Sequence, residues 1–211
     1  MPVADIVPIS ESSPDPETIR RAADVLAGGG VVAFPTDTLY AFGCVLGNAA
    51  AADRIAKMRQ IDSGKRPFSL LLPDVGPLPR YAEVSESAYR IIERLLPGPY
   101  CIELRATAKV NGSPGFSQRQ TLGLRIPASA VCYKLLWRLG RPIVSVTAKD
   151  DANTTLTTAQ AIADAYGDQL DLILDGGRQE GLPSTVISLV DDWITVLRAG
   201  RGSTANLIPS R

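Results

Sequence analysis

Residues 31–44 read VVAFPTDTLYAFGC, and this stretch decides the prediction of the fold. Its four apolar residues, 31–34, predict a buried strand, and hydroxyl side chains follow where that strand ends. Because open α/β sheets bind ligands at the ends of their strands, Thr36, Thr38 and Tyr40 are candidate binding residues. The alternative is an ordinary strand–loop–helix connection in which an Asx or threonine turn uses the same hydroxyls.

Helical and strand patterns alternate along the rest of the chain. The first predicted helix has Ser13 or Asp15 near its N-cap and ends at Gly28–Gly30. The last two strands are joined too closely to be parallel, so they predict a hairpin and a mixed sheet. We expect helices over residues 14–27, 49–59, 84–95, 129–139 and 157–166, and strands over residues 31–34, 68–72, 100–105, 121–126, 142–147, 172–175, 185–190 and 194–197.

The pattern indicates one α/β domain over residues 1–211, with its core at about 14–200. Residues 201–211 carry Gly, Ser and Pro and predict a weakly ordered tail. The longest stretch without a regular pattern, residues 109–120, predicts a mobile loop and is the best candidate for a lid.

Composition excludes several classes of protein. The 211 residues hold 22 Lys+Arg and 22 Asp+Glu, and no run approaches the roughly 20 apolar residues that span a bilayer, so we expect a cytoplasmic protein with no membrane contact. The absence of histidine excludes a Ser-His-Asp or Cys-His hydrolase and a His-zinc site. Three widely spaced cysteines predict free thiols, and we expect no protein-bound metal.

Basic residues gather after the second predicted helix. Lys57 and Arg59 lie at the end of that helix, and Lys65 and Arg66 stand at the start of the next strand. Four cations this close together can converge on one polyanion. Lys57 and Arg59 have a structural alternative, because the helix dipole favours cations at a helix C-terminus.

Single polar residues mark further strand ends. Arg125 sits in an apolar strand and needs a partner there, which is either a bound carboxylate or phosphate or an acidic residue of the chain. Ser145 and Thr147 are two residues apart, so both hydroxyls lie on one face of a strand end, and Lys149 follows them. Ser184 stands at the start of another strand.

Taken in order, these groups resemble one known family. The motifs are Pro-Thr-Asp-Thr-x-Tyr-x-x-Gly-Cys, Lys-x-Arg, Lys-Arg-Pro-Phe-Ser-Leu, Pro-Gly-Pro before a strand, Leu-Arg-Ile-Pro, Ser-x-Thr-Ala, Asp-Gly-Gly, Ser-Thr-Val and Leu-Arg-x-Gly. Together they resemble the YrdC/YciO family, the threonylcarbamoyl-adenylate synthases, over roughly residues 28–200.

The resemblance implies a twisted open mixed α/β sheet with helices on its faces and a deep basic groove. It also implies a nucleotidyltransferase reaction in which L-threonine, bicarbonate and ATP, which carries Mg²⁺, give threonylcarbamoyl-AMP and pyrophosphate for the t6A modification of tRNA. Carried over to this sequence, the roles fall as follows: catalysis on Lys57, Arg59 and Arg125; substrate and nucleotide binding on Thr36, Thr38, Tyr40, Lys65, Arg66, Ser145, Thr147, Lys149, Ser184 and Arg198.

Two departures from the family pattern resemble the YciO branch. Ala41-Phe42 replaces the usual Gly-Leu, and Lys149 replaces the usual Asn. We expect Lys149 to contact a nucleotide phosphate or to pair with Asp150 or Asp151.

Two other functions stay open. The first is a non-catalytic protein that binds a nucleotide, tRNA or double-stranded RNA, which Lys149, Lys109 and Arg119 favour and the zero net charge does not. The second is a carbamoyl-transfer module like that of the hydrogenase-maturation carbamoyltransferases, although this chain lacks their accessory domains.

Overall fold

The computed structural model describes residues 4–61, 68–110, 113, 120–205 and 207. Its strands are β1 (Asp5–Pro8), β2 (Val32–Phe34), β3 (Ala41–Val45), β4 (Ser69–Leu71), β5 (Ala82–Glu83), β6 (Tyr100–Ala106), β7 (Thr121–Arg125), β8 (Ile143–Thr147), β9 (Leu172–Asp175), β10 (Thr185–Ser188) and β11 (Thr195–Arg198). Its helices are α1 (Pro16–Ala27), α2 (Ala49–Met58), α3 (Glu86–Leu95), α4 (Ala130–Leu139) and α5 (Ala159–Tyr166), with short 3-10 helices at Leu78–Arg80 and Val190–Asp192.

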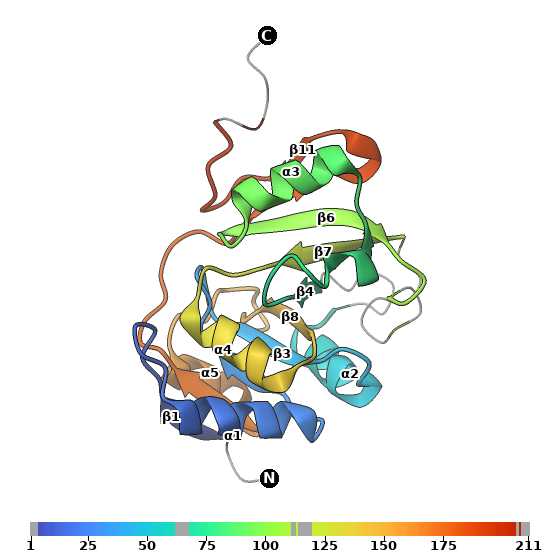
Figure 1. Ribbon diagram of the computed structural model, residues 1–211. Helices are drawn as coiled ribbons and strands as arrows, with labels where there is room; N and C mark the ends of the chain where they lie inside the picture. The colour runs from blue at the N-terminus through green and yellow to red at the C-terminus, as the bar shows by residue number, and fades with distance from the viewer. Residues whose placement is uncertain (1–3, 62–67, 111–112, 114–119, 206, 208–211) are drawn as a thin grey trace.

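All eleven strands join one mixed sheet (Figure 1). Its order is β1-β9-β2-β3-β8-β4-β7-β6-β10-β11, and β5 pairs with β6. The pairs β1–β9, β9–β2, β4–β7 and β6–β10 are parallel, and the other neighbours are antiparallel. The predicted α/β domain with a mixed sheet is therefore confirmed, and so is the C-terminal hairpin, β10–β11.

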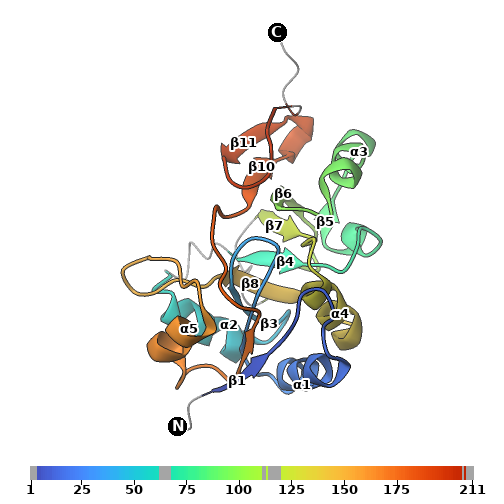
Figure 2. The ribbon, with the colours of Figure 1, turned by 90° about the vertical axis from the view of Figure 1, so that its left-hand side faces the viewer.

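Helices cover both faces of the sheet. Helices α1 and α4 pack against each other on one face, over Phe34, Leu71 and Ile143. Helices α2, α3 and α5 pack into a second apolar cluster built on strand residues that face the other way, among them Phe42 and Leu124. Figure 2 shows α1 with α4 and α2 with α5 on opposite sides of the lower half of the sheet.

Each helix begins at a polar residue that caps it. The side chains of Asp15, Asn48, Ser85, Ser129 and Thr158 each accept a hydrogen bond from the backbone N–H three residues later. These bonds satisfy donors that the first helical turn leaves unpaired. The caps explain why helix starts could be predicted to within two residues.

Three strands were not predicted: the two-residue β5, which pairs with β6, and the longer β3 and β1. Residues 41–45 form β3, a fully buried strand between β2 and β8, although the sequence suggested a connection there. Residues 5–8, Asp-Ile-Val-Pro, form β1, an edge strand that pairs only with β9, and this short segment in a polar, Pro-rich N-terminus gave no strand signal. Both strands are formed by pairing with distant parts of the chain, which local periodicity does not report.

The start of the predicted tail is held in place. Arg201 Nη1 donates to the Asp37 carbonyl at 2.8 Å, and Thr185 Oγ1 donates to the Gly202 carbonyl at 2.6 Å. This order differs from the expected weakly ordered tail, whose residues 206 and 208–211 lie outside the described residues. Most of the predicted lid, residues 111–112 and 114–119, also lies outside them. No helix in the described part of the chain has the length and apolar character that crossing a bilayer requires.

Candidate functional site

Four neighbouring strands place three polar side chains and one glycine in one row of the sheet. Ser145 on β8 pairs with Ser69 on β4, Ser69 with Gly123 on β7, and Gly123 with Glu103 on β6. Residues in one row face the same side, and all four line a cavity of about 350 Å³. Leu71, two residues further along β4 on the same face, packs with α1 and α4 instead. The cavity therefore lies where these helices no longer cover that face.

The row Ser145, Ser69, Gly123 and Glu103 forms the floor of the cavity, and Gly123 adds no side chain to it. A Cβ atom at this position would lie 2.8 Å from Cys101 Sγ and 3.4 Å from Ser69 Oγ. The first distance is shorter than real Cβ contacts, so any side chain would displace the thiol or project into the cavity. Glycine thus leaves room for the Cys101 thiol, which lies 3.4 Å from Ser69 Oγ, and keeps side-chain atoms of β7 out of the cavity in this row.

Arg125 reaches the cavity from β7 and is held by a buried carboxylate. Its Nη2 donates to Asp37 Oδ1 at 2.7 Å and to Thr38 Oγ1 at 3.2 Å, and the ion-paired side chains are only 9% and 7% exposed. Burial raises the pKa of Asp37, and the attraction of Arg125 opposes that shift. Arg125 Nε is buried without a partner among the described residues, so it can donate to a ligand oxygen.

Arg59 joins the end of α2 to the loop that follows β8. Its guanidinium donates to the carbonyls of Thr147 at 3.2 Å and of Lys149 and Asp150 at 3.3 Å, and to Asn153 Oδ1 at 3.4 Å. Burial lowers the pKa of Arg59. Arg59 therefore shapes the cavity wall that Thr147 and Lys149 line, and it lines the cavity itself.

Lys149 points to a neutral partner at the cavity. Its Nζ donates to Asn153 Oδ1 at 3.2 Å. The expected ion pair with Asp150 or Asp151 does not occur among the described residues, because those carboxylates accept from the Thr154 N–H and the Tyr166 hydroxyl. The ammonium still lines the cavity, so the predicted phosphate contact stays a prediction.

Ser184 and Arg198 form the opposite wall. Arg198 Nη2 and Nε donate to the Ser184 carbonyl at 2.8 and 3.3 Å, and both residues line the cavity. A Cβ at Gly200 would lie 2.2 Å from the Pro183 carbonyl oxygen, which is backbone and cannot rotate away. The Leu-Arg-x-Gly motif thus places an arginine beside a close approach of two backbone segments that only glycine permits.

Several predicted site residues lie away from the cavity. Thr36 Oγ1 donates to the Leu39 carbonyl at 2.7 Å and accepts from the Thr38 N–H at 3.1 Å, so it closes the threonine turn that the sequence offered as the alternative. Neither Thr36 nor Thr38 lines the cavity, although Thr38 contacts Arg125. Lys57 is exposed in the last turn of α2, outside the cavity wall. Lys65 and Arg66 lie outside the described residues.

Tyr40 lines the cavity, but its hydroxyl is bonded to the loop after β9. The hydroxyl donates to the Gly177 carbonyl at 2.7 Å and accepts from the Gly176 N–H at 3.0 Å, and it also lies 3.3 Å from Asp175 Oδ1. Burial raises the pKa of Tyr40 to about 12. Tyr40 therefore anchors the Asp-Gly-Gly motif, so its hydroxyl is not a free donor for a ligand.

We expect Tyr40→Phe to lower the free energy of unfolding by about 1–3 kcal/mol, because it removes hydrogen bonds to the Gly177 carbonyl and the Gly176 N–H, each worth about 0.5–1.5 kcal/mol. Urea denaturation measures the loss. Tyr133→Phe is the matched control, since Tyr133 is half exposed on α4. Equal midpoints for the two variants would show that the Tyr40 hydroxyl does not anchor the loop.

Sequence reasoning missed four polar or sulfur-bearing residues of the cavity: Ser69, Cys101, Glu103 and Asn153. The first three lie within strands, where alternation could have shown that Cys101 and Glu103 share a face opposite to the buried Ile102 and Leu104. Which face meets the cavity is set by strand pairing, which the sequence does not show. Among the described residues, no group of three or more His, Cys, Asp or Glu side chains could hold a metal ion.

The geometry defines an α/β protein whose sheet carries a cavity at the ends of several strands, and the polar groups of that cavity are mostly hydroxyls and cations. The Sua5/YciO/YrdC family model, described as telomere recombination, matches residues 24–200. The chain therefore belongs to the Sua5/YciO/YrdC family.

Three relatives illustrate the range of the family. The uncharacterized YciO protein of Escherichia coli is 33% identical over 195 residues, covering 92% of this chain and 94% of its own. Its crystal structure superimposes with a TM-score of 0.88 at 32% identity, over 96% of this chain and 98% of that chain. The structure of P. abyssi Sua5 complexed with L-threonine gives a TM-score of 0.85 at 28% identity, over 93% of this chain and 58% of that chain. The threonylcarbamoyl-AMP synthase of Vibrio vulnificus is 28% identical over 162 residues, 75% of this chain and 86% of its own.

Proposed function

We propose that this protein is an L-threonylcarbamoyladenylate synthase, which forms threonylcarbamoyl-AMP and pyrophosphate from L-threonine, bicarbonate and ATP. The observation that carries the proposal is Arg125, a nine-tenths buried guanidinium that lines the cavity with an unused Nε–H donor. Family membership supports it, since relatives include a threonylcarbamoyl-AMP synthase and a protein solved with L-threonine. The product would serve t6A modification of tRNA in the cytoplasm.

The chemistry needs charge stabilisation rather than a protein nucleophile. The threonine amine attacks the carbon of bicarbonate to give a carbamate with loss of water. A carbamate oxygen then attacks the α-phosphorus of ATP, and the bond to the β-phosphate oxygen breaks to release pyrophosphate. Burial raises the pKa of the Cys44 and Cys132 thiols to about 12, and it also raises that of Cys101, so these thiols stay protonated at neutral pH.

The cavity supplies fixed donors for the negative charge that moves in these steps. Arg125 Nε would bind the threonine carboxylate or an α-phosphate oxygen, and Arg59 and Lys149 lie on the wall where the outer phosphates would enter. Arg198 and the hydroxyls of Ser145, Thr147 and Ser184 would complete the phosphate contacts. Prearranged donors of this kind lower the barrier because they need no reorganisation during the reaction. Mg²⁺ would enter with ATP, held by its phosphates and by water.

The test is pyrophosphate release by the purified protein. We expect release to require L-threonine and bicarbonate together with ATP. Arg198→Ala should lower kcat/KM by about a hundredfold, the usual loss for one donor that stabilises a transition state. Arg105→Ala is the control, because Arg105 is ion-paired with Asp191 and does not line the cavity. Release that ignores threonine or bicarbonate would contradict the proposal.

A second candidate function is nucleotide or RNA binding without turnover. Lys149 favours it, since an ammonium at the cavity adds a phosphate contact without a role in the carbamate chemistry. Salt-dependent binding of tRNA or double-stranded RNA by a folded protein that releases no pyrophosphate would support this function over the synthase.

A further inference from the structure

Glu103 is the one carboxylate among the described residues that line the cavity, where the charged side chains are otherwise Arg59, Arg125, Lys149 and Arg198. Its position follows from the register of the sheet. Glu103 pairs with Gly123 on β7 and with Ser188 on β10, so its side chain shares a face with Gly123 and, beyond it, Ser69.

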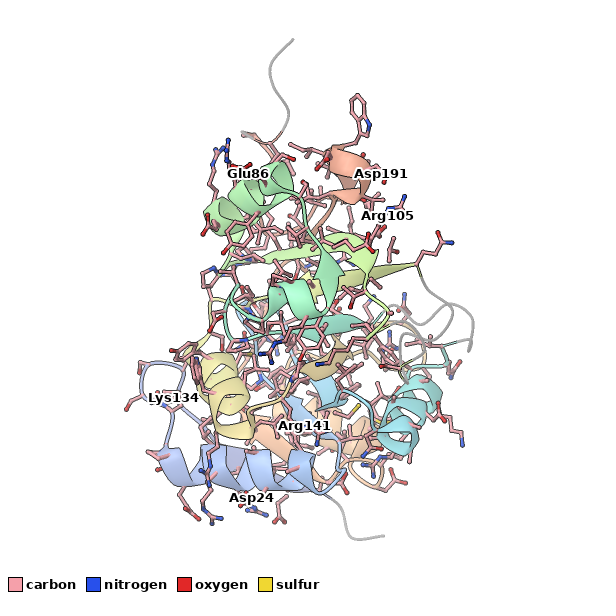
Figure 3. All side chains as sticks on the ribbon, turned by 45° about the vertical axis from the view of Figure 1, so that its right-hand side comes forward. Asp24, Glu86, Arg105, Lys134, Arg141 and Asp191 are labelled. Carbon is pink, nitrogen blue, oxygen red and sulfur yellow. The ribbon has the colours of Figure 1, made fainter. Side chains whose placement is uncertain are left out.

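The Glu103 carboxylate makes no side-chain hydrogen bond or ion pair within the described part of the chain, although cations surround it. Each of the four cations of the cavity already donates to another group. Arg105, the next residue of β6 on the same face, pairs with Asp191 at 2.8 Å, and Figure 3 shows these two side chains together near the top of the molecule. Glu103 is therefore not paired with any of these cations.

The space beside Glu103 suits a compact group that carries positive charge. The backbones of β4 and β6 are two strand spacings apart, roughly 10 Å, and Gly123 on the strand between them has no side chain. The Cys101 thiol, 3.4 Å from Ser69 Oγ, takes up the Ser69 side of this space, so the open part lies beside Glu103. A phosphate there would be repelled by the carboxylate. An ammonium would form a charge-assisted hydrogen bond, which is stronger than the bond from a neutral hydroxyl.

We propose that Glu103 binds the α-ammonium of the amino-acid substrate and so fixes the end of that molecule at which the carbamate forms. The bound ammonium passes one proton to the Glu103 carboxylate, and the free amine then attacks bicarbonate. The inference rests on the proposed synthase function, because ATP and bicarbonate carry no cationic group. It gives the cavity two separate recognition elements: cations and hydroxyls for phosphates and carboxylate, and one carboxylate for the amine. Glu103 thereby selects α-amino acids over hydroxy or deaminated acids.

Ligand affinity of Glu103→Gln tests the proposal, because the amide keeps the shape and removes the charge. Calorimetry would compare L-threonine, 3-hydroxybutyrate, which lacks the amine, and ATP. We expect at least about tenfold weaker binding of L-threonine and less than about twofold change for the other two. Glu86→Gln, on the exposed side of α3, is the control and should bind like the wild type.

Three results would overturn the proposal. They are unchanged L-threonine affinity in Glu103→Gln, an equal loss for L-threonine and 3-hydroxybutyrate, and a loss confined to ATP. A wild type that binds no L-threonine would overturn it together with the synthase function. A wild type that binds L-threonine through Glu103 but forms no threonylcarbamoyl-AMP would contradict the synthase function alone.

Discussion

Arg125→Met is expected to lower the free energy of unfolding by about 3–5 kcal/mol, the usual cost of removing one partner of a buried ion pair. The reason is Asp37, whose side chain is 7% exposed and would be left as a buried charge without its guanidinium. Its remaining hydrogen bond, from the Ala128 N–H at 3.1 Å, does not replace that interaction. Denaturation in urea at neutral pH measures the loss.

The deficit of Arg125→Met should depend on pH. Burial already raises the pKa of Asp37 in the wild type against the attraction of Arg125, and the variant removes that attraction, so the pKa rises further. A carboxyl whose pKa is raised by folding binds more protons in the folded protein than in the unfolded chain. The stability that it contributes is therefore lost as the pH rises above the pKa of Asp in the unfolded chain, about 3.9. We therefore expect a smaller deficit at about pH 4 than at neutral pH.

A double variant separates the buried charge from lost packing. Asp37→Asn combined with Arg125→Met removes both charges and should recover part of the stability that Arg125→Met loses. If Arg125→Met loses less than about 1 kcal/mol of unfolding free energy, or if that loss does not change with pH, the buried Asp37–Arg125 pair does not stabilise the fold.

Gly123→Val should weaken binding of both ATP and L-threonine by about tenfold to a hundredfold, because overfilling a packed space typically costs 1–3 kcal/mol. The valine would stand in the row between Ser69 and Glu103, on the floor of the cavity. No charged or hydroxyl group is removed, so the loss of affinity measures only the effect of filling this space. Calorimetry with each ligand measures it.

The contact at Cys101 allows folding and binding to be separated. A Cβ at Gly123 meets Cys101 Sγ at 2.8 Å, so Gly123→Val should also destabilise the fold. Adding Cys101→Ala removes that sulfur and should restore stability without restoring affinity, since the valine still fills the floor. Cys101→Ala alone is the control. Recovery of ligand affinity in the double variant would contradict the assignment of this row as the ligand floor.

Much of the fold could be predicted because its signals are local. Capping residues such as Asp15 and Ser129 mark the starts of helices, and the glycine after α1 marks its end. Each signal lies within a few residues of the boundary that it marks. Strand β3 could not be predicted, because the hydroxyl-rich residues 36–40 before it resemble a connection. Only its pairing with β2 and β8 makes it a strand. The position of β1 beside β9 has the same cause, because those two segments are more than 160 residues apart.

The residues of the candidate site also divide into those with a local sequence signal and those placed by distant pairing. Hydroxyls at strand ends were found from the sequence, and Ser145, Thr147 and Ser184 do line the cavity. Arg198, which only the family resemblance indicated, lines it too. Thr36 and Tyr40 also carry hydroxyls, but Thr36 closes the turn that the sequence offered as the alternative. The Tyr40 hydroxyl bonds to backbone 137 residues away, which the sequence cannot show. Glu103 was missed because a charged residue in an alternating strand normally faces water; strand register, not composition, turns it toward the cavity.

If this cavity joins an amino acid, bicarbonate and a nucleotide, the carbon of ¹³C-labelled bicarbonate must appear in the product. The purified protein would be incubated with ATP, Mg²⁺, L-threonine and the labelled bicarbonate, and the products examined by mass spectrometry. We expect threonylcarbamoyl-AMP that carries the label, formed by the wild type and not detected when L-threonine is omitted. Folded protein that binds ATP and L-threonine yet gives no labelled adenylate would contradict the proposed synthase function.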